Sequence, residues 1–290
     1  MRKGLRALNR SKRVNRSRAG TVLMFLVMLV FACFMALPLA LIISNAFKPL
    51  DELWVFPPKL IPTSPTTVNF RDMFTVMSSS WVPFLRYIFN TVFITAAGTA
   101  GHIILASMCA FPLAKKKFPG RDFIFNLIVL ALMFNATVTA IPNYITMATL
   151  GWIDTHLSLI IPAFAMPLGL YLMKQFMEQL PDSLLEAARI DGSSQWHTFW
   201  YIVMPNVKSA WLTLLLLSVQ SLWGIGNTNF IYKEELKTLP YALNQILAGG
   251  IARAGVGAAV SVFMMIVPIA IFIFSQSNII ETMSTSGMKD

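Results

Sequence analysis

The side chains best suited to specific polar contacts gather in one segment between long apolar runs, Gln179 to Pro205. Ser183 and Glu186 have the S-x-x-E spacing of a capping box, in which each side chain satisfies a backbone N–H at the start of a helix. Gly192 follows where a left-handed residue would end that helix. The spacing therefore predicts a short helix between Ser183 and Gly192.

Small residues on this predicted helix favour contact with another backbone. Ala187 and Ala188 would let a second chain approach closely, and Asp191 is placed to cap the next segment. An ordinary amphipathic connector explains the same pattern equally well on physical grounds alone.

Residues that catalyse reactions or hold metals are scarce in the sequence. His156 and His197 lack matching Cys, His or Asp partners, so we predict no metal site. No Gly is followed directly by Lys, which excludes the phosphate-binding pattern G-x-x-x-x-G-K-[ST]. Cys33 and Cys109 both fall within apolar runs and are interpreted as small packing residues. Without a nucleophile and base, a membrane enzyme is a remote alternative.

The elements that position this segment are apolar. The chain is 56% hydrophobic and 12% charged, whereas soluble domains are roughly 25% charged. Six charge-free runs reach the roughly 20 residues that a helix needs to cross a bilayer: Thr21–Phe47, Tyr87–Ala114, Phe123–Ile153, Thr155–Met173, Ser209–Tyr232 and Ala254–Ile280. The stretch from Gly192 to Val207 is too short and too polar to count. We expect an all-α, polytopic membrane protein with six transmembrane helices.

One boundary in this count is weak, because only Asp154 separates the third run from the fourth. A re-entrant pair of helices at that position is the alternative. His102 lies within the second run, where an ionisable group is a functional candidate. A neutral histidine hydrogen-bonded to a neighbouring helix is the commoner arrangement. None of the six runs contains Asp or Glu, which argues against proton-coupled transport.

The net charge of +10 is first a topology signal, because cytoplasmic segments retain Lys and Arg. Eight basic residues precede Thr21, which places the N-terminus inside, and six spans return the C-terminus to the same side. This arrangement puts 16 of the 23 Lys and Arg on the inner side. We expect the basic tail to meet anionic lipid and predict no nucleic-acid partner.

The spans divide the chain into segments. We predict a basic cytoplasmic tail (1–20), a first span (21–47), an external loop (48–84), a core of five spans (85–277) and a cytoplasmic C-terminal tail (278–290). Within the core lie a cytoplasmic loop (178–208) and a second external loop (227–253).

The cytoplasmic loop resembles the EAA loop of the inner-membrane permeases of ABC importers, E-A-A-x-x-x-G followed by I-x-L-P. The residues that carry the resemblance are Glu186, Ala187, Ala188, Asp191, Gly192, Ile202 and Pro205. Met204 replaces the usual Leu, which conserves volume, and Ala210 stands where many members have Pro. The segments Leu180–Asp182, Leu222–Gly224 and Lys237–Leu243 look like the maltose-type, carbohydrate-uptake subfamily.

The resemblance implies a type I importer permease fold and a subunit that is not an enzyme. The EAA helix would dock into an ATP-hydrolysing subunit, while Ile202 and Pro205 would fix its exit into the fifth span. Implied partners are two cytoplasmic ATP-binding subunits, a second homologous permease and an extracytoplasmic solute-binding protein. This chain would bind no cofactor, because ATP and Mg²⁺ belong to the partner. The implied location is a bacterial or archaeal cytoplasmic membrane.

Polar residues within the spans are candidates for the path of a sugar, which requires hydroxyl-matching groups and aromatic faces. These are Asn90, Asn135, Asn143, Gln220 and Trp223. Hydrogen bonding between helices explains each of them equally well. An importer for a non-sugar solute stays open, as does a secondary carrier working alone, although the inverted repeat of broken helices typical of carriers is not apparent.

Overall fold

A computed structural model describes residues 18–78, 82–134, 136–226, 229–248, 250 and 253–286. Regular structure in these residues is entirely helical, without a strand. The order of elements begins with α1 (Arg18–Ala46), α2 (Leu50–Leu53), α3 (Val68–Ser78) and α4 (Phe84–Lys115). The predicted all-α class is confirmed.

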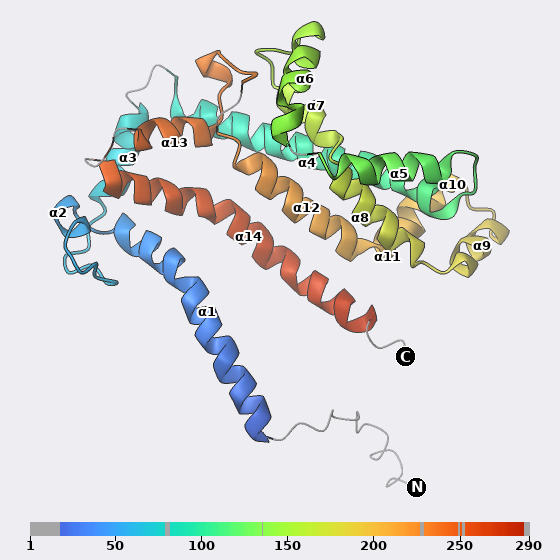
Figure 1. Cartoon of the computed structure of the whole chain (residues 1–290), viewed down its shortest axis with the longest axis horizontal. Coiled ribbons are helices and arrows are strands. Elements are labelled where there is room, and N and C mark those ends of the chain that lie inside the picture. Colours follow the sequence, from blue (N-terminus) through green and yellow to red (C-terminus); the bar gives the residue numbers. More distant parts are fainter. Residues whose placement is uncertain are drawn as a thin grey trace.

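Helix α4 is the centre of the bundle. It packs against α7 (Leu157–Phe164), α8 (Pro167–Glu178) and α12 (Lys208–Trp223). Helix α14 (Ala254–Ser286) runs beside α12 and contacts α1, whose N-terminal part stands clear of the other helices (Figure 1). The most apolar 18-residue window of α1 has none of its residues buried, although Ser44 and Ala46 at the end of the helix are buried. A helix so apolar must be covered by lipid or by another subunit.

Buried contacts of α4 with α8 and α12 form the main core. Gly98 and Gly101 of α4 leave no room for a Cβ atom, which would lie 2.6 Å from Leu222 and 2.0 Å from Phe164. His102 is buried, and its Nδ1 lies 3.0 Å from the Ser218 hydroxyl of α12. The interpretation of His102 as a hydrogen-bonded link between helices is confirmed.

One end of the bundle carries a cap that we name the outer cap. It consists of α2, α3, η2 (Glu234–Leu236) and α13 (Leu239–Leu247). Apolar side chains of α3 and α13 pack against α4 and α14. Figure 1 shows these four helices close together at this end of the molecule. The loop after α1 is tied down as well, because Asn69 donates to the carbonyls of Ala46 and Lys48 at 3.0 and 2.7 Å.

The opposite end carries a series of short helices. These are α5 (Arg121–Ala131), α9 (Asp182–Ile190), α10 (Gln195–His197), the π-helix η1 (Thr198–Val203) and α11 (Met204–Asn206). Helix α5 lies against α8, whereas α6 (Ala136–Thr149) stands beside α7 near the middle of the molecule and points away from the bundle (Figure 1).

Four described helices are long and apolar enough to cross a membrane: Ala19–Ala46, Phe84–Lys115, Leu157–Glu178 and Ala254–Gln276. A bent pair, Gln195–Asn206 with Lys208–Trp223, adds a fifth candidate at an angle of 79°. The expected count of six is therefore not confirmed. The stretch that the sequence excluded, Gly192–Val207, is mostly helix and forms the first part of that bent pair.

The prediction of one continuous span from Phe123 to Ile153 is wrong. The run is divided between α5 and α6, with turns and a bend at Leu132–Phe134. These three residues include neither Gly nor Pro, so no local helix breaker marks the position. The length of a charge-free run shows how many apolar residues follow one another. It cannot show where the chain turns between two helices, such as α5, which packs on α8, and α6.

Candidate functional site

The start of α9 is held to the end of α4 by Lys115. Its ammonium donates to the Asp182 carboxylate at 2.8 Å and to the carbonyls of Leu180 and Glu178 at 2.5 and 3.3 Å. The hydrogen bond and the charge of Lys115 lower the pKa of Asp182, and the charge of Lys117 adds to this effect. A carboxylate in the first turn also suits the positive end of the helix dipole.

The predicted capping box is wrong. Helix α9 begins at Asp182, one residue before Ser183, and its cap residue, Pro181, makes no side-chain hydrogen bond. Asp191 does not cap the next helix either, because Ser194 does so by accepting from the His197 N–H at 3.2 Å. The spacing alone could not exclude a start one residue earlier.

The predicted end of α9 is confirmed. Gly192 has φ +77°, the left-handed conformation that favours glycine. Its N–H donates to the Arg189 carbonyl at 3.1 Å, and the Ser193 N–H donates to the Ala188 carbonyl at 2.9 Å. These two bonds are the Schellman arrangement, which satisfies carbonyls left free at a helix end.

Helix α9 presents one face to its own bundle and one face outward. Ala188 is buried, while Glu186 and Ala187 are exposed. Another chain can therefore contact Ala187 but not Ala188, which is covered by the bundle itself. The sequence analysis missed Ile190, which is 86% exposed. An apolar residue at the end of an exposed polar helix was the signal that could have identified it.

The exit from α9 toward α12 is irregular. The π-helix η1 ends just before Met204, and Pro205 follows with no N–H to donate. The Asn206 side chain donates to the Ile202 carbonyl at 2.7 Å within the same turn. A 79° bend then leads into α12. Ile202 and Pro205 thus lie at this bend, at the position where the sequence analysis placed the exit.

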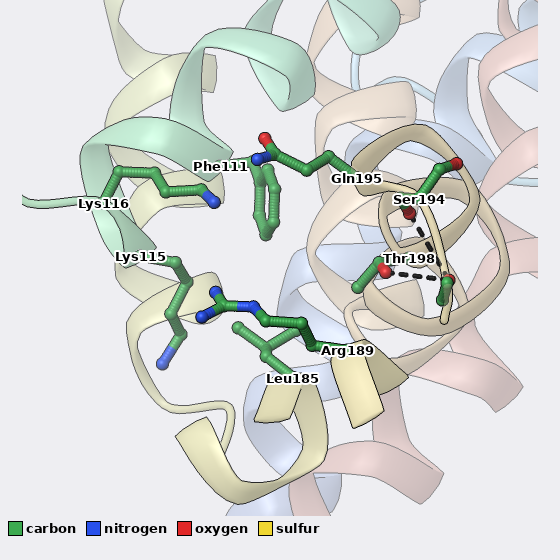
Figure 2. A pocket seen from close by; sticks show the side chains of 9 residues that line it. Phe111, Lys115, Lys116, Leu185, Arg189, Ser194, Gln195 and Thr198 are labelled. Atoms are coloured by element: carbon green, nitrogen blue, oxygen red, sulfur yellow. Dashed lines mark hydrogen bonds between the residues drawn. The ribbon is translucent and has the colours of Figure 1, made fainter. Parts of the chain in front are cut away.

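A network of ion pairs supports the base of α9. Glu178, at the end of α8, contacts Lys174 at 2.7 Å and Arg121 at 3.3 Å. Arg121 also donates from Nε to the Leu113 carbonyl of α4 at 2.7 Å. Helices α4, α5 and α8 are thereby joined within a few residues of the point where α9 begins. Figure 2 shows Leu185 and Arg189 of α9 facing Phe111 of α4 across a small cavity.

The proposed path residues differ in burial and bonding. Asn90 and Trp223 are buried and bonded: Asn90 donates to the Glu235 and Lys237 carbonyls, and the Trp223 indole donates to the Met264 carbonyl. Asn143 and Gln220 are exposed, on α6 and α12. Asn135 lies outside the described residues. Two of the five therefore hold helices and loops in place.

Comparison with known proteins identifies the class. Residues 102–284 match the family model of the binding-protein-dependent transport system inner membrane component. Because this match covers more than half of the chain, the protein belongs to that family of membrane permease subunits. The expected family and the membrane location are thus confirmed.

Individual relatives are similar over most of the chain. The arabinooligosaccharides transport system permease protein AraQ of Halalkalibacterium halodurans is 30% identical over 269 residues, covering 89% of this chain and 93% of the relative. Protein LplC of Bacillus subtilis is 33% identical over 188 residues, covering 65% of this chain and 61% of that protein. The fold matches a bacterial ABC transporter that imports the acidic polysaccharide alginate, with TM-score 0.77, 22% identity and coverage of 91% of this chain and 99% of the other.

Proposed function

We propose that this permease subunit serves an ABC importer for sugars or oligosaccharides, which an extracytoplasmic solute-binding protein delivers. The sugar assignment rests on the arabinooligosaccharide permease that is similar over nearly the whole chain. The alginate importer with the same fold, solved also with a pentasaccharide-bound periplasmic protein, supports the solute-binding partner. An importer for a non-sugar solute is the alternative.

Helix α9 is the element that docks the ATP-hydrolysing subunit. The observation that carries this assignment is its geometry, because both ends are fixed while Glu186, Ala187 and Ile190 face outward. A helix held in this way presents a defined surface at little entropic cost. Closure of two such ATP-binding subunits would reach the spans through the bend at Pro205. ATP and Mg²⁺ are held by those subunits, and this chain requires no cofactor.

A second, homologous permease completes the membrane assembly. The apolar stretch of α1 is unburied within this chain, and α6 exposes Val138, Ile141 and Ile145. Two widely separated apolar surfaces fit a partner subunit that covers at least one of them.

The end that carries α9 faces the cytoplasm, together with both chain termini. The basic cluster at the end of α4 and the basic residues before Thr21 favour this orientation. The outer cap then meets the solute-binding protein.

Reconstitution of the complete complex in lipid tests the proposal. ATPase activity is measured with the cognate binding protein, loaded in turn with each of a panel of sugars and with non-sugar solutes. Stimulation by at least one carbohydrate is expected, whereas stimulation only by non-sugar solutes contradicts the sugar assignment. Glu186→Lys is expected to prevent ATPase co-purification while leaving the permease in the membrane. Normal co-purification and transport by this variant would overturn the docking assignment.

A further inference from the structure

We propose that the cavity between the end of α4 and the α9–α10 loop binds the headgroup of an anionic phospholipid. The cavity has a volume of about 320 Å³. Its lining combines basic, hydroxyl and apolar side chains: Phe111, Lys115, Lys116, Leu185, Arg189, Ser193, Ser194, Gln195 and Thr198. The inference concerns lipid binding by this chain alone, so it does not depend on the docking role of α9.

Two cations of this cavity lack a counter-ion within the described part of the chain. Lys116 and Arg189 take part in none of the ion pairs found there, whereas Lys115 is bound to Asp182. Figure 2 shows the Lys116 and Arg189 side chains pointing toward one another beside the Phe111 ring, while Lys115 points away. Two like charges that face a common space favour an anion between them. A phosphate is well suited, because arginine binds its oxygens in a bidentate fashion.

A second cavity lies next to the first and has a more apolar lining. It has a volume of about 270 Å³ and shares Phe111 and Gln195 with the first. Its other lining residues are Met108, Trp196 and Phe199, all apolar or aromatic. A basic cavity that adjoins an apolar one follows the order of groups in a phospholipid, from phosphate to glycerol and acyl chains. A free inorganic anion would not need the apolar part.

The position along the molecule also fits a lipid headgroup. The spanning helix α4 ends at Lys115, directly beside the cavity. Trp196 and Tyr201 are 61% and 70% exposed on the segment that bends by 79° into α12. Exposed tryptophan and tyrosine beside basic residues are typical of the membrane–water interface.

Trp196 provides a local reporter of occupancy. The full-length permease is reconstituted in phosphatidylcholine nanodiscs with increasing fractions of brominated phosphatidylglycerol. The Trp196 signal is the fluorescence difference between each protein and its Trp196→Phe counterpart. Quenching is expected to saturate at a low phosphatidylglycerol fraction. In the Lys116→Gln/Arg189→Gln variant, the fraction required for half-quenching is expected to rise about tenfold, since each basic residue contributes to attraction of anionic lipid.

Matched variants separate a site from general attraction. Arg13→Gln/Arg16→Gln removes the same charge from the N-terminal tail and is expected to leave the quenching curve unchanged. The charge-preserving Lys116→Arg variant should also retain binding, which guards against a folding defect of the double variant. Equal quenching by brominated phosphatidylcholine, or equal curves for both double variants, would overturn the proposal.

A competition arm distinguishes lipid from a soluble anion. Inorganic phosphate at about 10 mM, with ionic strength matched by chloride, is expected to leave the half-quenching fraction unchanged, because it gains nothing from the apolar cavity. Loss of phosphatidylglycerol quenching at that concentration would reassign the cavity to a free anion and contradict the lipid proposal.

Discussion

The two ends of α4 are joined to the rest of the molecule by different kinds of contact. At the outer cap, buried side chains of α4 make neutral hydrogen bonds: Asn90 donates to two carbonyls at 2.8 and 2.9 Å, and Thr91 accepts from the Leu239 N–H at 2.7 Å. One charged bond lies beside them, from the Tyr87 hydroxyl to the Glu234 carboxylate at 2.8 Å. At the α9 end the main link is the ion pair of Lys115 with Asp182, whose side chains are 6% and 78% exposed.

This difference indicates different mechanical roles. Buried hydrogen bonds are costly to break, because each freed group has no water to bind. An ion pair with one exposed partner costs less to break, since water solvates the Asp182 carboxylate once the groups separate, while Lys115 keeps its bonds to the Leu180 and Glu178 carbonyls. We therefore predict that the outer cap resists rearrangement more strongly than the α9 end. Four variants test this contrast.

The largest effect is expected at the outer cap. Asn90→Ala removes both donors to the Glu235 and Lys237 carbonyls. The free energy of unfolding in detergent should fall by about 2 to 4 kcal/mol, because the fully buried Asn90 side chain and its two hydrogen bonds are lost. Denaturant titration measures the change. The matched control is Asn143→Ala, an exposed asparagine on α6. An equal change in both variants would contradict the rigid outer cap.

The middle of α4 belongs to neither end, and a substitution facing it should show an intermediate effect. Gly169 of α8 packs there against His102 of α4, because a Cβ at Gly169 would lie 1.9 Å from Nε2 of His102. Gly169→Ala should therefore cost about 1 to 3 kcal/mol through overpacking. Gly224→Ala is the control, because its new Cβ meets only the Gln220 carbonyl at 3.6 Å. Loss of the same size in the control would contradict overpacking against His102 as the cause.

At the end of α9 the expected cost is smaller. Gly192→Ala places a Cβ in open space, so only the left-handed backbone conformation is penalised. A loss of about 1 kcal/mol is expected, measured by denaturant titration. Gly192→Asn should lose less, since asparagine tolerates this conformation. Equal stability of wild type and Gly192→Ala would exclude strain as the reason for glycine.

The smallest effect concerns the ion pair itself and depends on pH. Because Lys115 holds the Asp182 pKa below its usual 3.8, the pair contributes stability above that pH and loses it as pH falls through the lowered pKa. Asp182→Asn should therefore lower the unfolding temperature slightly at pH 6 and have no effect near pH 2. Thermal unfolding at both pH values checks this. Asp191→Asn, with no ion pair in the described residues, should show no such difference.

The sequence predicted those features that depend on local backbone chemistry. Gly192 was identified as a left-handed helix end because few other residues adopt that conformation readily. The α class and the family followed from apolar runs and one motif. Local spacing failed at Ser183 and Asp191, since several neighbouring residues can cap a helix and tertiary contacts, here those of Lys115, select among them.

Features that depend on packing were beyond the sequence. The break between α5 and α6 leaves no mark in Leu132–Phe134. Nothing near Asn90 in the sequence indicates its partner, the Glu235 carbonyl, which is 145 positions away. A polar residue in an apolar run indicates that its side chain needs a hydrogen bond, but the sequence does not identify the partner.

The 79° bend before α12 has a consequence for the transmission of force. The segment from Gln195 to Asn206 is a short lever about 18 Å long, given a rise of about 1.5 Å per residue. Rotation of this lever by about 10° about the bend displaces its far end, beside α9, by about 3 Å. When the angle of the bend stays fixed, a displacement of about 3 Å beside α9 therefore tilts α12 by the same angle of about 10°.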